Sequence, residues 1–329
     1  MKHTPRTVSR RFDSPPHLPS NPPVQDKPTN GMIAAGLVAA IILWGQNNAA
    51  TKYLAGYWPP VTIGVTRFLS AGLILLGVLH WTDWLGRSEA VSKELNRRLW
   101  RVSLLTLSAY ILCYTFAIRF TSASNVALYL GTAPVWALIW EERPKLTWRS
   151  AQSYTAALLA LAGVVILVWP NMRGRNSPWI GDLFGVGASL FWTAYGRECR
   201  TLSKSLLPPE VSACTFWRTG VILLPLALIE IFIKPPPLRT NLVLIQVYCV
   251  LASGVVAFIL WNKGLRWWPT SRVYLFNNLI PLSTMLSAYF FIHEPISHTF
   301  WVAMLCIVGG VLLGQTNWQK LFSRWLPEV

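Results

Sequence analysis

Polar side chains interrupt several long apolar runs of this sequence, where a few amides, ring hydroxyls and guanidinium groups could bind a solute. A bare metal ion would need carboxylates, so these groups suit a small, partly apolar molecule with a few hydrogen-bonding atoms. Hydrogen bonding that only holds helices together is the alternative explanation for about half of them. The candidate binding residues are Gln46, Asn47, Asn48, Tyr110, Asn125, Tyr129, Trp192, Tyr195, Asn277 and Asn278.

Two arginines occupy similar places in their apolar runs. Arg67 lies about two turns beyond Pro59 and Pro60, and Arg218 lies about two turns beyond Pro208 and Pro209. As a matched pair they could attract an anionic group or form gates. The alternative is that each side chain extends to the membrane surface and sets helix depth.

No catalytic constellation accompanies these residues. The sequence has no GxSxG, no HExxH and no phosphate-binding glycine loop. Its five cysteines fall in or beside apolar runs without CxxC or Cys/His spacing, which is typical of packing residues. We therefore expect no enzyme activity, no metal and no cofactor.

The elements that must position the polar residues are membrane helices. The chain is 53% hydrophobic and only 13% charged, whereas about a quarter of the residues in soluble domains are charged. A spanning helix needs about 20 apolar residues. Ten such windows occur, near 33–53, 60–80, 101–119, 122–140, 152–170, 180–198, 212–233, 243–262, 270–292 and 298–316. The predicted fold class is an all-α polytopic membrane protein with ten transmembrane helices.

The two halves of the chain resemble each other. Pro134 follows Arg119 by the same number of residues as Pro281 follows Arg266, and Trp192 matches Trp44. Both prolines should kink their helices, because proline removes a backbone hydrogen bond. Each half holds five helices, so the second half enters the membrane in the opposite orientation. We expect two inverted five-helix repeats, 32–170 and 179–317.

The basic residues predict the orientation. With the N-terminus inside, most lysines and arginines fall in links on the cytoplasmic side, as the positive-inside rule requires. The net charge of +16 is spread over these links rather than over a soluble face, so no nucleic-acid partner is expected. Residues 1–31 are predicted to form a disordered, basic, proline-rich cytoplasmic tail, and 318–329 a short cytoplasmic tail.

The chain resembles the EamA-type permeases of the drug/metabolite transporter superfamily. The similarity covers about Met32 to Trp318 and rests on the order of several runs of residues. These are LWGQNNAATKYL, PPVTIGVTRFLSA, AIRFTSASNVALYLGTAPV and ALLALAGVVIL in the first half, and SLFWTAYG, AFILWNKGLRWW, LIPLSTMLSAYFFIHEP and IVGGVLLG in the second. The resemblance implies a ten-helix, two-repeat exporter that moves amino acids or related metabolites by alternating access through a central cavity.

One departure from the family concerns the Gly-Glu pair that usually closes the two central helices. His293-Glu294 stands in its place in the second half and Trp140-Glu141-Glu142 in the first. The first-half acid follows its proline more closely than the second-half acid does, so we expect a fourth helix that is shortened at its inner end.

The sequence therefore predicts a secondary transporter of small organic metabolites in the inner (plasma) membrane, with both termini cytoplasmic. Proton antiport and facilitated diffusion both remain open as its coupling. The expected partners are a small-molecule substrate and the lipid bilayer. The apolar fifth helix, ALLALAGVVILVWP, suits either packing or a homodimer contact. The alternative function is a non-transporting membrane scaffold or sensor that works through its basic tail.

Overall fold

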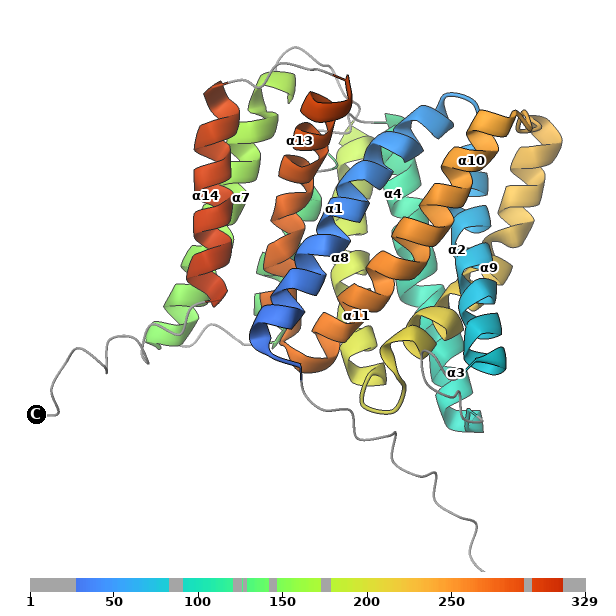
Figure 1. Cartoon of the computed structure of the whole chain (residues 1–329), viewed down its shortest axis with the longest axis horizontal. Coiled ribbons are helices and arrows are strands. Elements are labelled where there is room, and N and C mark those ends of the chain that lie inside the picture. The colour runs from blue at the N-terminus through green and yellow to red at the C-terminus, as the bar shows by residue number, and fades with distance from the viewer. Residues whose placement is uncertain are drawn as a thin grey trace, which may run out of the picture.

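The structure is a computed structural model that describes residues 28–82, 91–120, 126, 129–141, 147–172, 179–292 and 298–315. Every regular element within these ranges is a helix, and the helices form one bundle (Figure 1). The elements are α1 (Asn30–Ala55), α2 (Pro60–Trp81), α3 (Lys93–Val102), η1 (Ser103–Ser108), α4 (Ala109–Phe120), α6 (Ala133–Glu141), α7 (Trp148–Met172), α8 (Trp179–Leu202), α9 (Pro208–Ile233), α10 (Thr240–Tyr248), η2 (Cys249–Val256), α11 (Ala257–Trp267), α12 (Thr270–Tyr274), η3 (Leu275–Leu279), α13 (Ile280–Ile292) and α14 (His298–Gln315).

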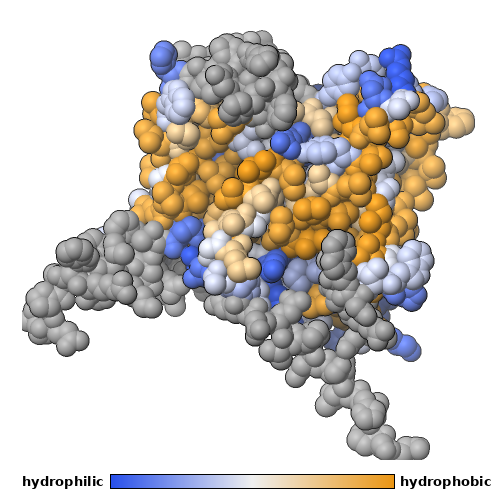
Figure 2. Space-filling view, viewed as in Figure 1, coloured by the Kyte–Doolittle hydropathy of each residue, from blue (hydrophilic) through white to orange (hydrophobic). Residues whose placement is uncertain are grey.

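Six helical runs in the described ranges are long and apolar enough to cross a membrane. They are Asn30–Ala55, Pro60–Trp81, Lys93–Phe120, Pro208–Ile233, Thr240–Trp267 and His298–Gln315. Figure 2 shows apolar residues in a band across the middle of the bundle, with hydrophilic residues toward both ends. Large apolar side chains such as Phe232 and Leu305 point outward, which suits contact with lipid rather than water. The chain is therefore an all-helical, multi-pass membrane protein. Residues 1–27 of the predicted N-terminal tail and the whole predicted tail 318–329 lie outside the described residues, and the last two residues of the former, 30 and 31, already belong to α1.

The beginning of α1 and the end of α14 lie at the same end of the bundle (Figure 1). The indole N–H of Trp268, just after α11, donates to Oδ1 of Asn30 over 3.2 Å. The guanidinium carbon of Arg272 lies 3.9 Å from the centre of the Trp268 ring, and an Arg272 nitrogen donates to the Gln315 carbonyl over 3.1 Å. We call this the Asn30 end.

Glu141, the last residue of α6, connects three elements at the Asn30 end. Its carboxylate accepts backbone N–H bonds from Thr270 (2.8 Å) and Ser271 (3.0 Å) at the start of α12, and Arg200 near the end of α8 pairs with it at 3.2 Å. An acid at a helix N-terminus satisfies N–H groups that have no partner within the helix. Glu141 therefore caps α12. Its pair with Arg200 places the end of α8 at the Asn30 end, where α1 begins.

The opposite end, which we call the Trp58 end, is held by a similar contact. Glu230 near the end of α9 accepts the backbone N–H groups of Val61 (3.3 Å) and Thr62 (2.8 Å) in the first turn of α2. The indole N–H of Trp58 donates to the Pro237 carbonyl over 3.0 Å in the link between α9 and α10. At both ends, a carboxylate near the end of one helix thus caps the start of another.

Glycines allow the closest helix contacts. A Cβ atom at Gly310 of α14 would lie 2.7 Å from the Ala156 carbonyl oxygen of α7, and one at Gly163 of α7 would lie 2.8 Å from the Ala303 carbonyl oxygen of α14. Helices α2 and α9 approach similarly at Gly72. The small residues of the fifth predicted helix therefore pack against α14 within the same chain.

Both prolines that were predicted to kink a helix occupy the second position of an α-helix that follows a break. Pro281 follows the 3₁₀ turn η3, which contains Asn277 and Asn278, and Pro134 follows a turn at Thr132. In a first turn, proline removes no intrahelical hydrogen bond, because those N–H groups have no partner within the helix. The interruption thus lies just before each proline.

Candidate functional site

A cavity of about 90 Å³ lies among helices from both halves of the chain. A water molecule needs about 10–15 Å³ on this measure, so the cavity has room for several waters or a small solute. Its walls combine aromatic rings, amides and one arginine. The lining residues are Trp44, Asn47, Asn48, Arg67, Phe68, Tyr110, Tyr114, Leu130, Gly131, Trp192, Ser253, Phe258, Asn277, Asn278, Ile280 and Pro281.

Eight of the residues predicted from sequence come together in this lining. They are Asn47, Asn48, Arg67, Tyr110, Trp192, Asn277, Asn278 and Pro281. Sequence reasoning did not propose the other lining residues, most of which are apolar or aromatic. One signal was available, because Trp44 occupies the same position in the first half as Trp192 in the second.

Three other predicted binding residues lie outside the lining. The Gln46 amide oxygen accepts a hydrogen bond from the Tyr248 hydroxyl (2.6 Å), which joins α1 to α10. The Tyr195 hydroxyl lies 2.9 Å from the Thr215 hydroxyl in the buried core. Tyr129 packs its ring against Gly185 of α8. Of the remaining predicted residues, Pro134 is buried in α6, and Asn125 lies outside the described residues.

Three asparagines carry buried polar atoms into the cavity wall. Among the described residues, Asn47 and Asn277 each have a buried side-chain oxygen with no hydrogen-bond partner, and neither amide atom of the fully buried Asn278 has one. The 3₁₀ turn η3 places Asn277 and Asn278 together on the chain, opposite Asn47 of α1. Buried polar atoms are normally bonded, so atoms left open around a cavity are suited to water or a ligand.

Arg67 contributes a positive charge to the same wall. Its guanidinium carbon lies 4.6 Å from the centre of the Phe68 ring, and its buried Nε has no partner. The guanidinium lies close enough to the hydroxyls of Tyr110 and Tyr114 on α4 to interact with them electrostatically. Within the described ranges no carboxylate pairs with this guanidinium, so its charge is available to whatever occupies the cavity.

Arg218 differs, although its place in the sequence is similar. One terminal nitrogen donates to the Cys214 carbonyl (2.7 Å) and the other to the Asn96 side chain (2.6 Å). The rings of Trp217 and Trp100 lie 4.4 and 5.6 Å from its guanidinium carbon. Only 5% of the residue is exposed, and it does not line the cavity. The protein itself thus bonds both terminal nitrogens of Arg218, although its buried Nε, like that of Arg67, has no partner among the described residues.

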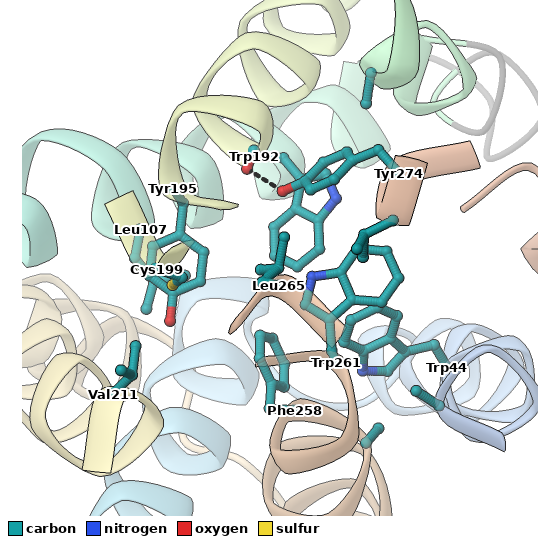
Figure 3. Packing of buried hydrophobic residues seen from close by; sticks show 14 of the residues in the cluster. Trp44, Leu107, Trp192, Tyr195, Cys199, Val211, Phe258, Trp261, Leu265 and Tyr274 are labelled. Carbon is teal, nitrogen blue, oxygen red and sulfur yellow. Dashed lines mark hydrogen bonds between the residues drawn. The ribbon is translucent and has the colours of Figure 1, made fainter. Parts of the chain in front are cut away.

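Trp44, Trp192, Phe258, Trp261 and Tyr274 form an aromatic cluster (Figure 3), and the first three of them also line the cavity. Trp44 of α1 lies 4.9 Å from Trp261 and 5.0 Å from Phe258, both of α11, measured between ring centres. The Tyr274 hydroxyl donates to the Trp192 carbonyl over 2.6 Å and thereby joins α12 to α8. Trp261 and Tyr274 are almost fully buried, and they lie between the cavity lining and the helix ends of α11 and α12. The cluster therefore separates the cavity from the Asn30 end.

A helical membrane bundle with polar groups around an internal cavity and interrupted helices beside it is typical of membrane transporters. The model of the EamA-like transporter family matches residues 30–169 and again residues 179–314. The chain belongs to this family and contains two copies of its domain.

Known relatives carry transporter names. The uncharacterized transporter YwfM of Bacillus subtilis is 25% identical over 292 residues, which covers 84% of this chain and 91% of YwfM. An uncharacterized transporter of Archaeoglobus fulgidus is 24% identical, with 84% of this chain and 95% of the relative covered. The uncharacterized inner membrane transporter YhbE of Escherichia coli is 24% identical, with 74% and 76% covered.

A solved crystal structure supports the fold. It aligns with a TM-score of 0.70 over 91% of this chain and 100% of the other chain, at 18% sequence identity. The likeness bears on the fold alone.

Proposed function

We propose that the protein is a secondary transporter, working as an exporter, that moves small organic metabolites through the cavity between its two family domains. The observation that carries the proposal is the lining itself: buried amide atoms without partners and an unpaired arginine, set among aromatic rings. An unpaired buried donor or acceptor costs about 1–3 kcal/mol. Such atoms also occur elsewhere in the bundle, but those of Asn47, Arg67, Asn277 and Asn278 gather around one cavity, where a ligand can bond them.

The lengths and directions of the helices support ten membrane-crossing segments in two inverted repeats. Besides the six apolar spans, α7, α8 and the run 270–292 are each about 35 Å long at 1.5 Å per residue, and α6 belongs to a tenth segment. The first family domain opens with α1, which begins at the Asn30 end, whereas the second opens with α8, which ends there. The two domains therefore run in opposite directions.

Alternating access would require the cavity to open toward each end in turn. In this structure the aromatic cluster closes the Asn30 end, so opening there must separate Trp44 from Trp261 and break the bond between Tyr274 and Trp192. The first contact joins α1 to α11 across the two domains, whereas the second joins α12 to α8 within the second domain. Relative motion of the domains is then the transport step.

The charge distribution supports a cytoplasmic Asn30 end. Arg98, Arg200, Lys204, Arg266 and Arg272 are all placed at this end, as the positive-inside rule expects for the cytoplasm. Both termini would then be cytoplasmic. The relative YhbE is named as an inner membrane protein, which supports the same location here. Export is the direction that the family resemblance implies.

Counterflow in proteoliposomes tests the function. Purified protein is reconstituted into vesicles loaded with one unlabelled solute, and accumulation of the labelled solute is followed. The panel contains amino acids, aromatic compounds, organic acids and sugars, and protein-free vesicles serve as the control. We expect at least one class to accumulate faster with protein. Monodisperse protein that accelerates no member of the panel would contradict the proposal.

A further inference from the structure

We propose that the cavity selects solutes that carry a carboxylate, with Arg67 as the residue that binds it. The inference rests on the proposed transport function and narrows its substrate class. It predicts that a negative charge on the solute is required and that an amino group is not.

The first step of the argument is the state of the two arginines. Arg218 has two strong hydrogen bonds and two aromatic rings around it, so the fold uses its charge. Arg67 lines the cavity, and no hydrogen bond or ion pair joins its guanidinium to another described residue. A partly buried charge without a partner is costly, and a ligand carboxylate removes this cost through charge-assisted hydrogen bonds.

The second step concerns the fixed position of Arg67. A Cβ atom added at Gly254 of η2 would lie 3.6 Å from Cγ of Arg67, so the stem of the arginine packs closely along this turn. The guanidinium carbon lies 4.6 Å from the centre of the Phe68 ring, which is a second contact of the same side chain. A guanidinium positioned in this way presents its planar donors to a ligand with little loss of freedom.

The third step limits the charge of the solute. The described part of the lining holds one cation and no carboxylate, and its other polar groups are neutral amides and hydroxyls. One guanidinium balances one negative charge, and a second negative charge in the same space would be buried without a partner. The lining therefore favours a monocarboxylate over a dianion or a phosphate.

The remaining lining accounts for the rest of the solute. Trp44, Phe68, Trp192 and Phe258 provide an apolar and aromatic surface, which suits a hydrocarbon or aromatic side group. The unpaired oxygens of Asn47 and Asn277 accept hydrogen bonds, so a hydroxyl or ammonium group on the solute adds affinity. The charge requirement, however, rests on Arg67 alone.

A pair of solutes of the same shape tests the inference. Binding of 4-methylpentanoate and of 4-methylpentanamide to the purified full-length protein is measured by calorimetry, with L-leucine as a third solute that adds an ammonium group. The acid and the amide differ in charge but hardly in size. We expect the acid to bind at least tenfold more tightly than the amide, and leucine to follow the acid.

Three variants locate the charge preference. Arg67→Gln should abolish the tenfold preference, and Arg67→Lys should retain part of it, because lysine keeps the charge without the planar donors. Arg239→Gln is the matched control: Arg239 is exposed at the Trp58 end beside Tyr57, so its removal should leave the preference unchanged. Size-exclusion profiles and helical circular dichroism establish that each variant is folded.

Several outcomes would overturn the inference. These are binding of acid and amide within twofold of each other, failure of the acid to bind, and full preference in Arg67→Gln. Because binding is measured apart from flux, the two proposals can fail separately. Flux of neutral solutes alone would support the transport function and refute the carboxylate site. Binding of the acid without any flux would support the carboxylate site and refute the transport function.

Discussion

At the scale of single residues, two fully buried asparagines separate a ligand-facing amide from a structural one. Asn278 lines the cavity, and neither of its amide atoms has a partner among the described residues. The Asn262 amide nitrogen instead donates to the Ser212 hydroxyl over 2.8 Å, and this residue lies outside the lining, although its amide oxygen has no partner either. Leucine has the same number and branching of side-chain heavy atoms as asparagine but no polar atoms. The same substitution should therefore affect different properties at the two sites.

We predict that Asn278→Leu lowers transport at least tenfold and changes the free energy of unfolding by less than about 1 kcal/mol, because no hydrogen bond is lost. Asn262→Leu should instead lower stability by about 1–3 kcal/mol, because it removes the buried hydrogen bond from the Asn262 amide to the Ser212 hydroxyl. Counterflow and thermal unfolding in detergent measure the two effects. Undiminished flux in Asn278→Leu would contradict a ligand contact of Asn278 and indicate that this residue only packs.

Substitution of the arginine outside the lining should cost more folding stability than substitution of the arginine in the lining. Arg218→Gln removes charged hydrogen bonds to Cys214 and Asn96, each worth about 1.5–3 kcal/mol, so we expect a loss of about 2–4 kcal/mol. Arg67→Gln removes no hydrogen bond between described residues and should change stability by less than about 1 kcal/mol. Denaturation midpoints compare them. Equal losses would contradict the different roles that we assign to the two residues.

From the residue types in the sequence, the chemistry of the cavity could be predicted. Which of these residues line the cavity could be predicted less well. Gln46, Asn47 and Asn48 are consecutive, and successive residues of a helix point about 100° apart, so all three cannot face one cavity. The structure turns Gln46 toward Tyr248 and leaves Asn47 and Asn48 in the lining. Local spacing cannot distinguish Arg67 from Arg218 either, because the distant Asn96 decides which arginine is satisfied.

At the scale of helices, the contact between α7 and α14 offers a matched pair of glycines. A Cβ atom at Gly310 would lie 2.7 Å from backbone atoms of Ala156 and Ala160, whereas one at Gly309 would meet only the Leu159 side chain at 3.9 Å. Both glycines lie within α14, so alanine removes the same conformational freedom from the unfolded chain at either position.

Gly310→Ala should therefore destabilise the protein by about 1–3 kcal/mol, the usual cost of overpacking, because the two helices must move apart. Gly309→Ala should leave stability unchanged or raise it by up to about 1 kcal/mol. Thermal unfolding of both variants in the same detergent is the measurement. A stable Gly310→Ala protein would mean that α7 and α14 pack less closely than the structure shows.

Two helical turns of unusual geometry were not predictable from sequence. The π-helical segments η1 and η2 lie inside long helices of the first and second family domain, respectively. Ser253 of η2 lines the cavity, and its carbonyl accepts the indole N–H of Trp44 over 3.2 Å. No residue type marks a π turn, since its wider ring depends on packing against neighbours. Such turns are frequent at functional sites.

The interruption near Pro281, by contrast, could be read from sequence, because proline and two adjacent asparagines all disfavour a helix interior. The short distance from Pro134 to an acid, which predicts a shortened fourth helix, was also visible in the sequence, and this shortening stays a prediction because residues 142–146 lie outside the described residues. The contact that this acid makes was not visible, because the N–H groups that Glu141 caps belong to Thr270 and Ser271, far along the chain.

At the scale of the whole molecule, the two ends of the bundle should face opposite sides of the membrane. Lys204 lies between α8 and α9 near the Asn30 end, and Lys234 lies between α9 and α10 near the Trp58 end, and both are exposed. In a cysteine-free background, Lys234→Cys should react with an impermeant thiol reagent on intact cells. Lys204→Cys should react only after the membrane is opened. The reverse pattern would invert the proposed topology.

The composition predicted a membrane protein, because a chain with so many apolar residues must expose many of them, and lipid solvates exposed apolar side chains better than water does. The number of segments is less directly visible. Charged residues such as Asp182, Glu198 and Arg200 lower the hydropathy of α8, although its length suits a crossing. The proposal of ten segments is supported by the corresponding segment of the other family domain in each case and by the directions of the helices.

The central claim is that solutes cross the membrane through this cavity, and Ser253→Cys tests it most directly. The substitution changes one atom in the lining, so the unmodified variant, in a background without the native cysteines, should transport like its parent. A small methanethiosulfonate reagent would add bulk to a cavity of about 90 Å³. We predict that modification, verified by mass spectrometry, stops counterflow and that reduction restores it. Full flux in the modified protein, or failure of the reagent to reach the cysteine in a transporting protein, would contradict the account.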